Sequence, residues 1–312
     1  MTDETAFAAQ LEPHRRELQV HCYRMLGSFD EAEDLVQETF LRAWRKRASY
    51  EGRATVRAWL YKIATNACLD LIARNKRRVS HTGATANPSE VPWLEPVPDV
   101  LLDEIASSDA GPEAAAVERE TIELAYLVAI QHLPPRSRAA LILRDVLGWS
   151  AKETATLLDM TVAAANSALQ RSREALREHL PDQRLDPNAE ERELLERYID
   201  ATDRADAQAF VEMMTPDARF SMPPEPGLWV GAQTIVDSWM EGGFGDPDWG
   251  HMRCIPTRAN RQPTVAAYVR RAGDDTYRLL AIDVLRLEGG KVAEITTFSG
   301  RALDPFGFPA TL

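Results

Sequence analysis

The sequence predicts a multidomain protein in which two all-α helical domains are followed by an α+β domain. Apolar residues recur at three- and four-residue steps up to about Arg78 and again over 119–180, as on amphipathic helices. Beyond Pro187, alternating apolar residues and glycine turns replace part of this pattern. Because one core rarely organises 312 residues, two or three domains are expected.

The domain boundaries are placed where the pattern changes. Between the two helical stretches, five prolines interrupt any helix: Pro88, Pro92, Pro96, Pro98 and Pro112. The predicted parts are a helical domain over 1–80, an acidic proline-rich linker over 81–118, a second helical domain over 119–180, a short linker over 181–189 and an α+β domain over 190–305.

The first helical domain contains two amphipathic stripes. Ser28-Phe29-Asp30-Glu31 has the spacing of a capping box and predicts a helix start. The stripe after it consists of Ala32, Leu35, Val36, Thr39, Phe40, Ala43 and Trp44. A second stripe consists of Val56, Leu60, Ile63, Ala67 and Leu71, and the polar face of its helix carries Arg57, Lys62, Asn66, Asp70 and Arg74.

The second helical domain has the pattern of a helix-turn-helix. A helix begins at Pro134-Pro135 and stops at Gly148, and Ser150-Ala151-Lys152-Glu153 is another capping box. After a tight turn around Asp159-Met160, Thr161 can cap a longer helix that runs to about Leu180. Such a second helix fits the DNA major groove. The pattern also fits an ordinary helical hairpin.

The C-terminal part predicts helices followed by a curved antiparallel sheet. We expect one helix over 190–214, a strand through Ala218, Phe220 and Met222, and a short helix over 232–240. Three strand-like runs follow, at 251–259, 263–272 and 276–298. The last is a hairpin that turns at Glu288-Gly289-Gly290.

The net charge of −12 is unevenly distributed. Residues 1–40 hold nine acidic side chains against three Arg, residues 41–79 hold eleven Lys and Arg against two acids, and residues 80–118 hold eight acids and neither Lys nor Arg. Since salt screens fields beyond about 8–10 Å, the basic block attracts phosphate whatever the total charge. This distribution indicates selective contact with DNA inside a larger assembly, although a solvated helix face would have the same composition.

Other classes of site and location are disfavoured. The three cysteines, Cys22, Cys68 and Cys254, are far apart, and the six histidines lack ligand spacing, so no metal or cofactor is expected. No apolar run approaches the roughly 18 residues of a membrane span, and no signal peptide is evident. We therefore expect a cytoplasmic protein without a membrane partner.

Two long segments carry a family resemblance. The run from Asp30 to Trp44, DEAEDLVQETFLRAW, and the run from Arg57 to Asp70, RAWLYKIATNACLD, resemble region two of extracytoplasmic-function sigma factors. Residues 132–179 are similar to region four of the same family, which recognises the −35 element. The resemblance implies binding to core RNA polymerase through its β′ clamp helices and β flap, and to promoter DNA.

The resemblance assigns roles in region two. Asp34, Gln37 and Glu38 lie where the family contacts the polymerase. The residues at positions that open and hold the −10 element are Arg53, Arg57, Trp59, Asn66, Lys76, Arg77 and Arg78. Unpaired strands are gripped by cations and stacking rings, which suits this set. Trp59 fits a core role equally well.

In region four, the resemblance implies −35 contacts by Asn166, Ser167, Gln170, Arg171 and Arg173. The chain has Asn166 and Ala168 where the family usually has cations, and Asp159 where it has glycine. Two fewer phosphate contacts predict weaker binding and a shallower salt dependence. The acidic linker corresponds to the segment that passes through the polymerase cleft in this family. The alternative is a flexible tether between the two regions.

The C-terminal domain resembles the cone-shaped SnoaL-like polyketide cyclases and ketosteroid isomerases over Leu195–Phe210, Pro216–Phe220 and Val284–Phe298. Such cones enclose an apolar pocket, whose candidate lining residues are Phe220, Trp229, Trp239, His251, Tyr268 and Asp283. Asp283 can act as a buried acid–base group, but one carboxylate without an oxyanion partner is thin support for catalysis. Binding of a small-molecule ligand, regulatory docking and structural support all remain open.

The hypothesis favoured by these features is a non-enzymatic sigma factor that directs transcription initiation and is modulated by its own C-terminal domain. The first alternative is a cyclase or isomerase fused to a DNA-binding module. The second alternative is a repressor that binds duplex DNA without polymerase. In a repressor, Asp34 to Glu38 and the helix that includes Arg57 to Asp70 would have no polymerase to bind and no promoter to open.

Overall fold

The computed structural model describes residues 3–50, 52, 54–75, 87–103, 121–179 and 189–312. The chain forms two compact units. The helical unit consists of 1–86 and 100–180, and the C-terminal unit consists of 87–99 and 181–312. The short segment 87–99 therefore belongs to the C-terminal unit, although it lies between the two helical stretches in the sequence.

The N-terminal half of the helical unit contains α1 (Asp3–Leu11), α2 (Arg15–Leu26), α3 (Phe29–Lys46) and α4 (Val56–Arg74), with short 3-10 turns at Glu12–His14 and Arg47–Ser49. Gly27, with φ of 75°, ends α2, and the Ser28 hydroxyl accepts from the Glu31 amide at the start of α3. Helices α2, α3 and α4 pack around side chains without solvent exposure, including Leu18, Met25 and Leu60.

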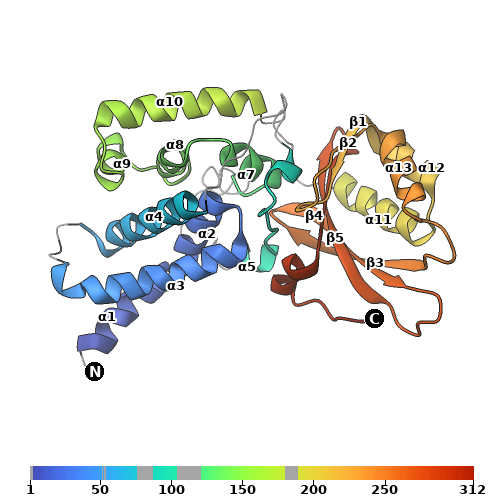
Figure 1. The fold of residues 1–312 in the computed structure, drawn as a ribbon, viewed down its shortest axis with the longest axis horizontal. Helices are drawn as coiled ribbons and strands as arrows, with labels where there is room; N and C mark the ends of the chain where they lie inside the picture. Colours follow the sequence, from blue (N-terminus) through green and yellow to red (C-terminus); the bar gives the residue numbers. More distant parts are fainter. Residues whose placement is uncertain (1–2, 51, 53, 76–86, 104–120, 180–188) are drawn as a thin grey trace. The chain divides into compact units, whose positions relative to one another are not determined.

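The second half contains α7 (Leu124–Gln131), α8 (Pro135–Leu141), the π-helix η4 (Ile142–Val146), α9 (Ala151–Leu157) and α10 (Val162–His179). The capping box at Ser150 and Glu153 is complete, and the Thr161 hydroxyl accepts from the Ala164 amide. Helices α9 and α10, joined by a four-residue turn, form the predicted helix-turn-helix (Figure 1). A further short helix, α5, covers Asp99–Asp103.

One buried arginine joins the two halves of the helical unit. The Arg138 guanidinium on α8 donates to the Met25 carbonyl at the end of α2, and to the carbonyl oxygens of Gln131 and Leu133 at 2.8 and 3.4 Å. It also donates to the Gln131 side-chain oxygen at 2.5 Å. A buried charge is tolerated only with such partners, so this network fixes how the halves pack.

The C-terminal unit is a six-stranded sheet in the order β2-β1-β6-β5-β4-β3. The strands are β1 (Met214–Ser221), β2 (Trp229–Val230), β3 (His251–Ala259), β4 (Gln262–Arg270), β5 (Arg278–Glu288) and β6 (Lys291–Ser299). The predicted hairpin turns at Gly289-Gly290, where φ values of 57° and 75° suit glycine. The helices α11 (Ala189–Asp203), α12 (Ala207–Met213) and α13 (Ala232–Glu241) cover one face of the sheet (Figure 1).

Two details differ from the sequence prediction. The expected single helix over 190–214 is wrong, because it is broken into α11 and α12 at Ala205, whose φ is 53°. The Asp206 side chain then caps α12 by accepting from the Ala209 amide. The sheet is also mixed rather than antiparallel, because β1 pairs with β6 in the parallel direction.

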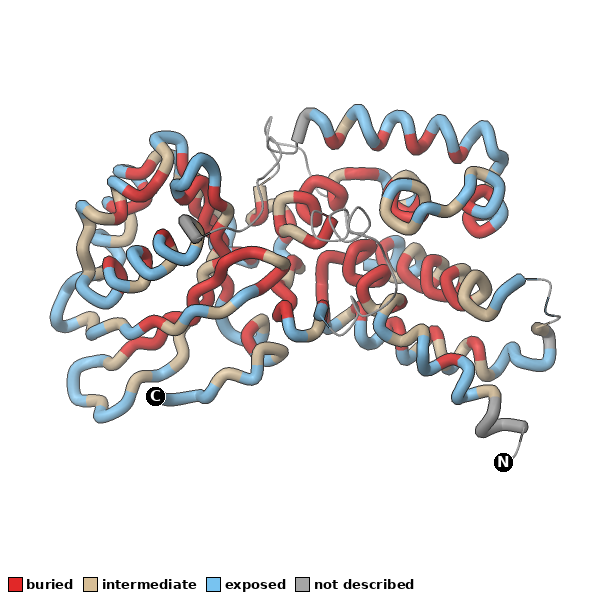
Figure 2. Tube along the Cα trace, turned by 180° about the vertical axis from the view of Figure 1, so that it is seen from behind, coloured by how far each residue is buried: buried red, intermediate tan, exposed pale blue. Residues whose placement is uncertain are grey.

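The inner strands β4 and β6 consist mostly of buried residues, and Figure 2 shows buried segments running through the C-terminal unit. The core between the sheet and its helices includes Tyr198, Phe210, Ile235, Leu285 and Ile295. At the start of β5, the C-terminal segment forms a short antiparallel pair with that strand, in which Thr311 lies opposite Arg278. The Leu312 amide donates to the Tyr277 carbonyl at 2.9 Å, after the 3-10 turn η5 (Gly300–Phe306).

Residues 87–99 lie on the other face of the sheet, opposite the helices (Figure 1). Ser89 Oγ donates to the Gly227 carbonyl at 2.6 Å, beside the edge strand β2. At the opposite edge, Val97 and Asn260 exchange two hydrogen bonds of 2.9 Å in the turn between β3 and β4. The segment is not extended throughout, because it begins with the 3-10 turn η3 (Pro88–Glu90). A second turn follows, in which the Leu94 amide donates to the Val91 carbonyl at 2.8 Å.

Among the described residues, no helix combines the length and apolarity that a membrane crossing requires.

Candidate nucleic-acid interface

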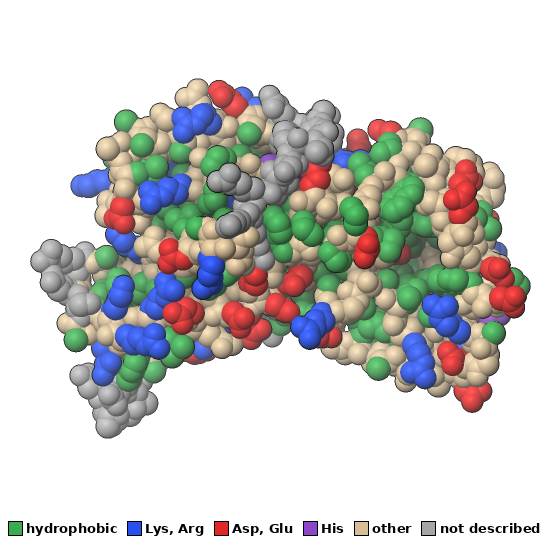
Figure 3. Space-filling model, in the orientation of Figure 1, with side chains coloured by type: hydrophobic (Ala, Val, Ile, Leu, Met, Phe, Trp, Pro, Cys, Tyr) green, Lys and Arg blue, Asp and Glu red, His purple; other side chains and the backbone are tan. Residues whose placement is uncertain are grey.

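The predicted −10 face lies on α4, which begins where Thr55 Oγ1 accepts from the Ala58 amide at 3.1 Å. Trp59, Lys62 and Asn66 follow one another at helical spacing, and all three side chains are partly exposed. Lys and Arg side chains are spread over the helical unit, on the left of Figure 3. The arrangement offers cations and one aromatic ring to a ligand.

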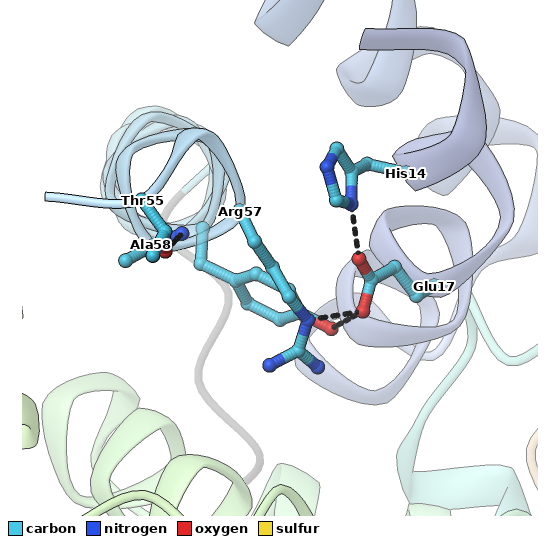
Figure 4. Close-up of polar contacts among 6 residues, drawn as sticks. His14, Glu17, Thr55, Arg57 and Ala58 are labelled. Atoms are coloured by element: carbon cyan, nitrogen blue, oxygen red, sulfur yellow. Dashed lines mark hydrogen bonds and ion pairs between the residues drawn. The ribbon is translucent and has the colours of Figure 1, made fainter. Parts of the chain in front are cut away.

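Arg57 is held by a carboxylate from α2 (Figure 4). Its Nε donates to Glu17 Oε2 at 2.7 Å, and Glu17 also contacts His14 Nδ1 at 2.6 Å. The Tyr61 hydroxyl donates to the same Glu17 oxygen at 3.2 Å, and the Arg57 guanidinium lies 5.0 Å from the Tyr61 ring centre. Burial raises the pKa of Tyr61, so the phenol stays neutral and acts as a donor.

Trp59 belongs to an aromatic cluster. Its ring lies 4.8 Å from that of Tyr50 and 6.4 Å, edge-on, from that of Phe7 on α1. Phe7 also contacts Trp44 at 6.1 Å. Trp59 thus has packing partners while its side chain keeps some exposure. Four other predicted −10 residues, Arg53, Lys76, Arg77 and Arg78, lie outside the described residues.

The predicted polymerase-binding residues occupy the exposed side of α3. Asp34 and Gln37 are exposed, and Glu38 accepts from Arg42 Nε at 2.8 Å. This hydrogen bond lowers the pKa of Glu38 and keeps the carboxylate charged. The neighbouring Leu41 exposes 51% of its surface, so the face combines anionic groups with an apolar one.

The predicted −35 residues lie on α10, which is the second helix of the helix-turn-helix. Asn166, Ser167, Gln170 and Arg171 are exposed. Arg173 is engaged by Asp145 of η4 in a two-pronged ion pair, with Nε–Oδ2 and Nη2–Oδ1 distances of 2.8 and 2.6 Å. Arg171 is therefore the more accessible cation for phosphate.

In the C-terminal unit, Asp283 faces the helix-covered core from β5. It accepts hydrogen bonds from the Tyr198 hydroxyl at 3.0 Å and from Thr297 Oγ1 at 2.6 Å. Burial raises the pKa of Asp283, and the two hydrogen bonds act in the opposite direction. Both carboxylate oxygens thus have partners within the chain.

The other predicted pocket residues do not converge on Asp283. The Phe220 ring lies 5.3 Å from the rings of both Trp229 and Trp239, and Trp239 also contacts Phe210 at 5.2 Å. His251 is exposed at the start of β3. Tyr268 is buried and donates to the Pro309 carbonyl under the C-terminal segment. Phe220 belongs to the hydrophobic core of this unit, and Trp229 and Trp239 pack against that core.

A hollow of about 380 Å³ lies elsewhere, between β5 and the C-terminal segment. It is lined by Leu279, Leu280, Gly300, Leu303, Asp304, Gly307, Phe308 and Ala310. In the part of the chain that the structure describes, no group of three or more His, Cys, Asp and Glu is arranged to hold a metal ion.

Sequence reasoning missed the carboxylates that pair with the cations of the interface. Glu17, Asp145 and Asp159 hold Arg57, Arg173 and Lys62 respectively. It also missed Asp99, which anchors the linker segment to Arg258 and to the Arg261 backbone. These partners lie between 28 and 162 positions apart, and no local pattern marks such pairs.

Comparison with known proteins agrees with this architecture. The sigma-70 region 2 family matches residues 11–78, sigma-70 region 4 matches 123–176, and the SnoaL-like domain matches 195–295. These regions and the helix-turn-helix define a transcription initiation factor of the sigma-70 class.

Full-length relatives narrow the class. The ECF RNA polymerase sigma factor SigG of Mycobacterium tuberculosis is 41% identical and covers 98% of this chain and 85% of its own length. SigW of Bacillus subtilis, also an ECF RNA polymerase sigma factor, is 32% identical over 58% of this chain and 91% of its own. The chain belongs to the extracytoplasmic-function (ECF) sigma factors, which act with RNA polymerase in transcription initiation.

A solved structure has the same fold. The crystal structure of the Mycobacterium tuberculosis extracytoplasmic function sigma factor SigJ aligns with a TM-score of 0.61 at 23% identity. The alignment covers 96% of this chain and 98% of that one. The sigma-70 regions and the 41% identity to an ECF sigma factor over 98% of this chain favour a sigma factor over an enzyme fused to a DNA-binding module.

Proposed function

We propose that the C-terminal domain of this sigma factor controls transcription initiation by holding the segment that links regions two and four. The linker of the family passes through the polymerase cleft. Residues 87–99 instead lie across the sheet of the C-terminal unit, anchored at both edges. A peptide cannot occupy both places, so docking on the sheet competes with entry into the cleft.

The contacts that anchor residues 87–99 on the sheet can stabilise the docked segment and can still be replaced by contacts with polymerase. Asp99 Oδ2 accepts from Arg258 Nε at 3.1 Å, and Asp99 Oδ1 accepts from the Arg261 amide at 2.7 Å. Val91, Leu94 and Val97 are buried, with at most 3% of their surface exposed. Each hydrogen bond to a charged group contributes about 1.5–3 kcal/mol. Polymerase contacts of comparable size can therefore displace the segment.

In this proposal the helical unit makes the promoter and polymerase contacts. Asp34, Gln37 and Glu38 bind the β′ clamp helices, and region four binds the β flap. The −10 element is held by the basic face of α4 together with Arg53 and Lys76–Arg78. The −35 element is read by Asn166, Ser167, Gln170 and Arg171, and Arg173 joins them once Asp145 releases it.

The C-terminal domain acts in this proposal by docking and not by turnover. Both carboxylate oxygens of Asp283 accept hydrogen bonds, one from Tyr198 and one from Thr297. A general base needs a carboxylate oxygen within hydrogen-bond distance of the substrate proton that it removes. Phe220 packs on Trp229 and on Trp239, so these predicted pocket residues contact one another and not Asp283. A small-molecule ligand of this domain would act by changing its grip on the linker.

A reversible cross-link tests the proposal. Pro98 and Ala259 are bridge partners in the structure, so Pro98→Cys with Ala259→Cys places two thiols at cross-strand distance. With the disulfide formed, we expect promoter-specific transcription with core polymerase to fall at least tenfold, and a reductant to restore it. Each single cysteine variant, treated alike, is the control. Equal transcription from the oxidised and reduced double variant would refute the proposal.

A further inference from the structure

We propose that Lys62 and Asp159 form a latch that keeps the helical unit closed, with region four held against region two so that the two regions cannot reach widely spaced promoter elements. Lys62 lies on α4, between the predicted −10 residues Trp59 and Asn66. Asp159 lies in the turn of the helix-turn-helix. Lys62 Nζ is 2.8 Å from Asp159 Oδ1, across 97 positions of the chain. The inference rests on the promoter contacts proposed above and adds a state that excludes them.

Lys62 also contacts the end of α9. Its ammonium lies 3.5 Å from the Thr156 carbonyl oxygen, in the last turn of that helix. The last carbonyls of a helix lack intrahelical donors and carry partial negative charge, so a lysine there is favourable. One cation thus receives two negative groups from region four.

The turn itself does not require a carboxylate. Asp159 has φ of 51°, in the left-handed region that glycine and asparagine adopt at least as easily as aspartate. Glycine or asparagine would therefore satisfy the bend. What the carboxylate adds is the ion pair with Lys62, since 69% of its side chain is otherwise exposed.

The residue next to Lys62 secures the other end of α9. The Tyr61 ring lies 5.4 Å from the ring of Trp149, and Trp149 directly precedes the Ser150 cap of α9. Tyr61 is fully buried. Two consecutive residues of α4 therefore hold both ends of the first helix of the helix-turn-helix.

This closed form is incompatible with simultaneous binding of the two promoter elements. The −10 and −35 elements are about 25 base pairs apart, which is on the order of 80 Å at 3.4 Å per base pair. Regions two and four must separate before they can reach both. In the closed form, Glu17 pairs with Arg57 and Asp145 pairs with Arg173, so two predicted DNA-binding cations are neutralised by the chain's own carboxylates. Asp159 neutralises Lys62 in the same way.

The latch is tested by the distance between regions two and four in the free full-length protein. Fluorophores are attached at Ala48→Cys and Ala163→Cys, both exposed, while the native Cys22, Cys68 and Cys254 are buried. Asp159→Asn keeps a residue suited to the left-handed turn and removes only the charge. We expect the fraction of open molecules to rise about two- to fivefold, as for loss of a partly exposed ion pair.

A double-mutant cycle separates the latch from indirect effects. Lys62→Gln should open the unit as much as Asp159→Asn, and the double variant should open it no further than either one. Added salt should open the wild type and leave Asp159→Asn unchanged. The matched control is Asp145→Asn, which breaks a pair within region four and should leave the inter-label distance unaltered. Circular dichroism on each variant establishes that it is folded.

The outcomes distinguish the latch from the proposed promoter contacts. An unchanged distance in folded Asp159→Asn, or additive effects in the double variant, would overturn the latch even if the wild type directs promoter-specific transcription. Conversely, a distance that responds as expected, with Lys62→Gln binding a promoter fragment as tightly as Asp159→Asn, would retain the latch and remove Lys62 from the DNA contacts.

Discussion

The Asp99 carboxylate accepts a hydrogen bond of 2.7 Å from the backbone nitrogen of Arg261, a residue 162 positions further along the chain. Arg261 lies in the tight turn between β3 and β4, where both Asn260 and Arg261 have positive φ. The backbone N–H groups of Asn260 and Arg261 in this turn donate to acceptors in the linker, the Val97 carbonyl and the Asp99 carboxylate. This contact ties the segment between the sigma regions to the SnoaL-like domain.

Removing that carboxylate should release the linker. Asp99→Ala is expected to lower the free energy of docking by about 3–6 kcal/mol, because two hydrogen bonds to a charged group, each contributing about 1.5–3 kcal/mol, are lost. Amide hydrogen exchange should then accelerate roughly a hundredfold or more at residues 91–98. The control is Asp275→Ala, in an exposed loop of the same unit, which should leave exchange in this segment unchanged. Slow exchange in both variants would show that Asp99 does not anchor the linker.

Arg138 should be the most sensitive position in the helical unit. Arg138→Met removes the donor to four acceptors, including the carbonyls of Met25 and Gln131, and we expect a loss of about 3–5 kcal/mol in the free energy of unfolding. Arg136→Met is the control, because Arg136 is exposed and makes one hydrogen bond of 3.3 Å, to Leu158. Chemical denaturation measures both. Similar losses in the two variants would contradict the assigned role.

The buried His21 should make the helical unit sensitive to acid. Burial, together with the charges of Arg24 and Arg57, lowers the pKa of His21 to about 3. Its ring contacts Thr65 Oγ1 at 2.9 Å. An unfolded chain has a histidine pKa near 6.5, so between about pH 6.5 and 3 the unfolded state binds one more proton, and stability falls as pH falls.

The slope is measurable by comparison with His21→Gln. The difference in unfolding free energy between wild type and variant should shrink by about 1.4 kcal/mol for each pH unit below 6.5. Chemical denaturation at pH 7, 6 and 5 provides the three values. A difference that stays constant over this range would mean that His21 is not held neutral by the fold.

Tyr198→Phe tests whether Asp283 is a structural carboxylate. The variant removes one of the two hydroxyl donors to Asp283, so we expect a loss of about 1.5–3 kcal/mol near neutral pH. The donor stabilises the ionised form, so the loss should diminish as pH falls and the carboxyl group becomes protonated. Tyr277→Phe, on a partly exposed tyrosine, is the control. A loss that does not vary with pH would show that the Tyr198 hydroxyl does not stabilise the ionised form of Asp283.

Local signals in the sequence located most of the elements. Ser150 with Glu153 identifies the start of α9, and Gly289-Gly290 identifies the β5–β6 hairpin, because capping and positive φ each require particular residues. The break at Ala205 could not be predicted, since alanine is a good helix former and only tertiary packing holds it at φ of 53°. The parallel pairing of β1 with β6 likewise depends on strands 70 or more positions apart.

The candidate site was predictable only in part. The cationic face of α4 follows from spacing and composition, so Arg57, Lys62 and Asn66 could be placed on one helix from the sequence. Their partners could not, because Glu17 and Asp159 lie on other elements and show no local pattern. The docking of 87–99 was unpredictable for the same reason. The sequence of an acidic, proline-rich segment predicts a linker whether or not the segment lies against a sheet.

The most direct test follows the linker between its two proposed locations. Spin labels at Pro92→Cys and Arg301→Cys, both exposed positions, report the separation between the linker and the C-terminal domain. We predict one narrow distance distribution in the free protein. When core RNA polymerase and promoter DNA are bound, the distribution should shift by at least about 10 Å. A segment packed on a sheet lies about 10 Å from it, so a segment that leaves the sheet moves by at least that distance. The same narrow distribution in a transcriptionally active complex would contradict the claim that the linker must leave the C-terminal domain.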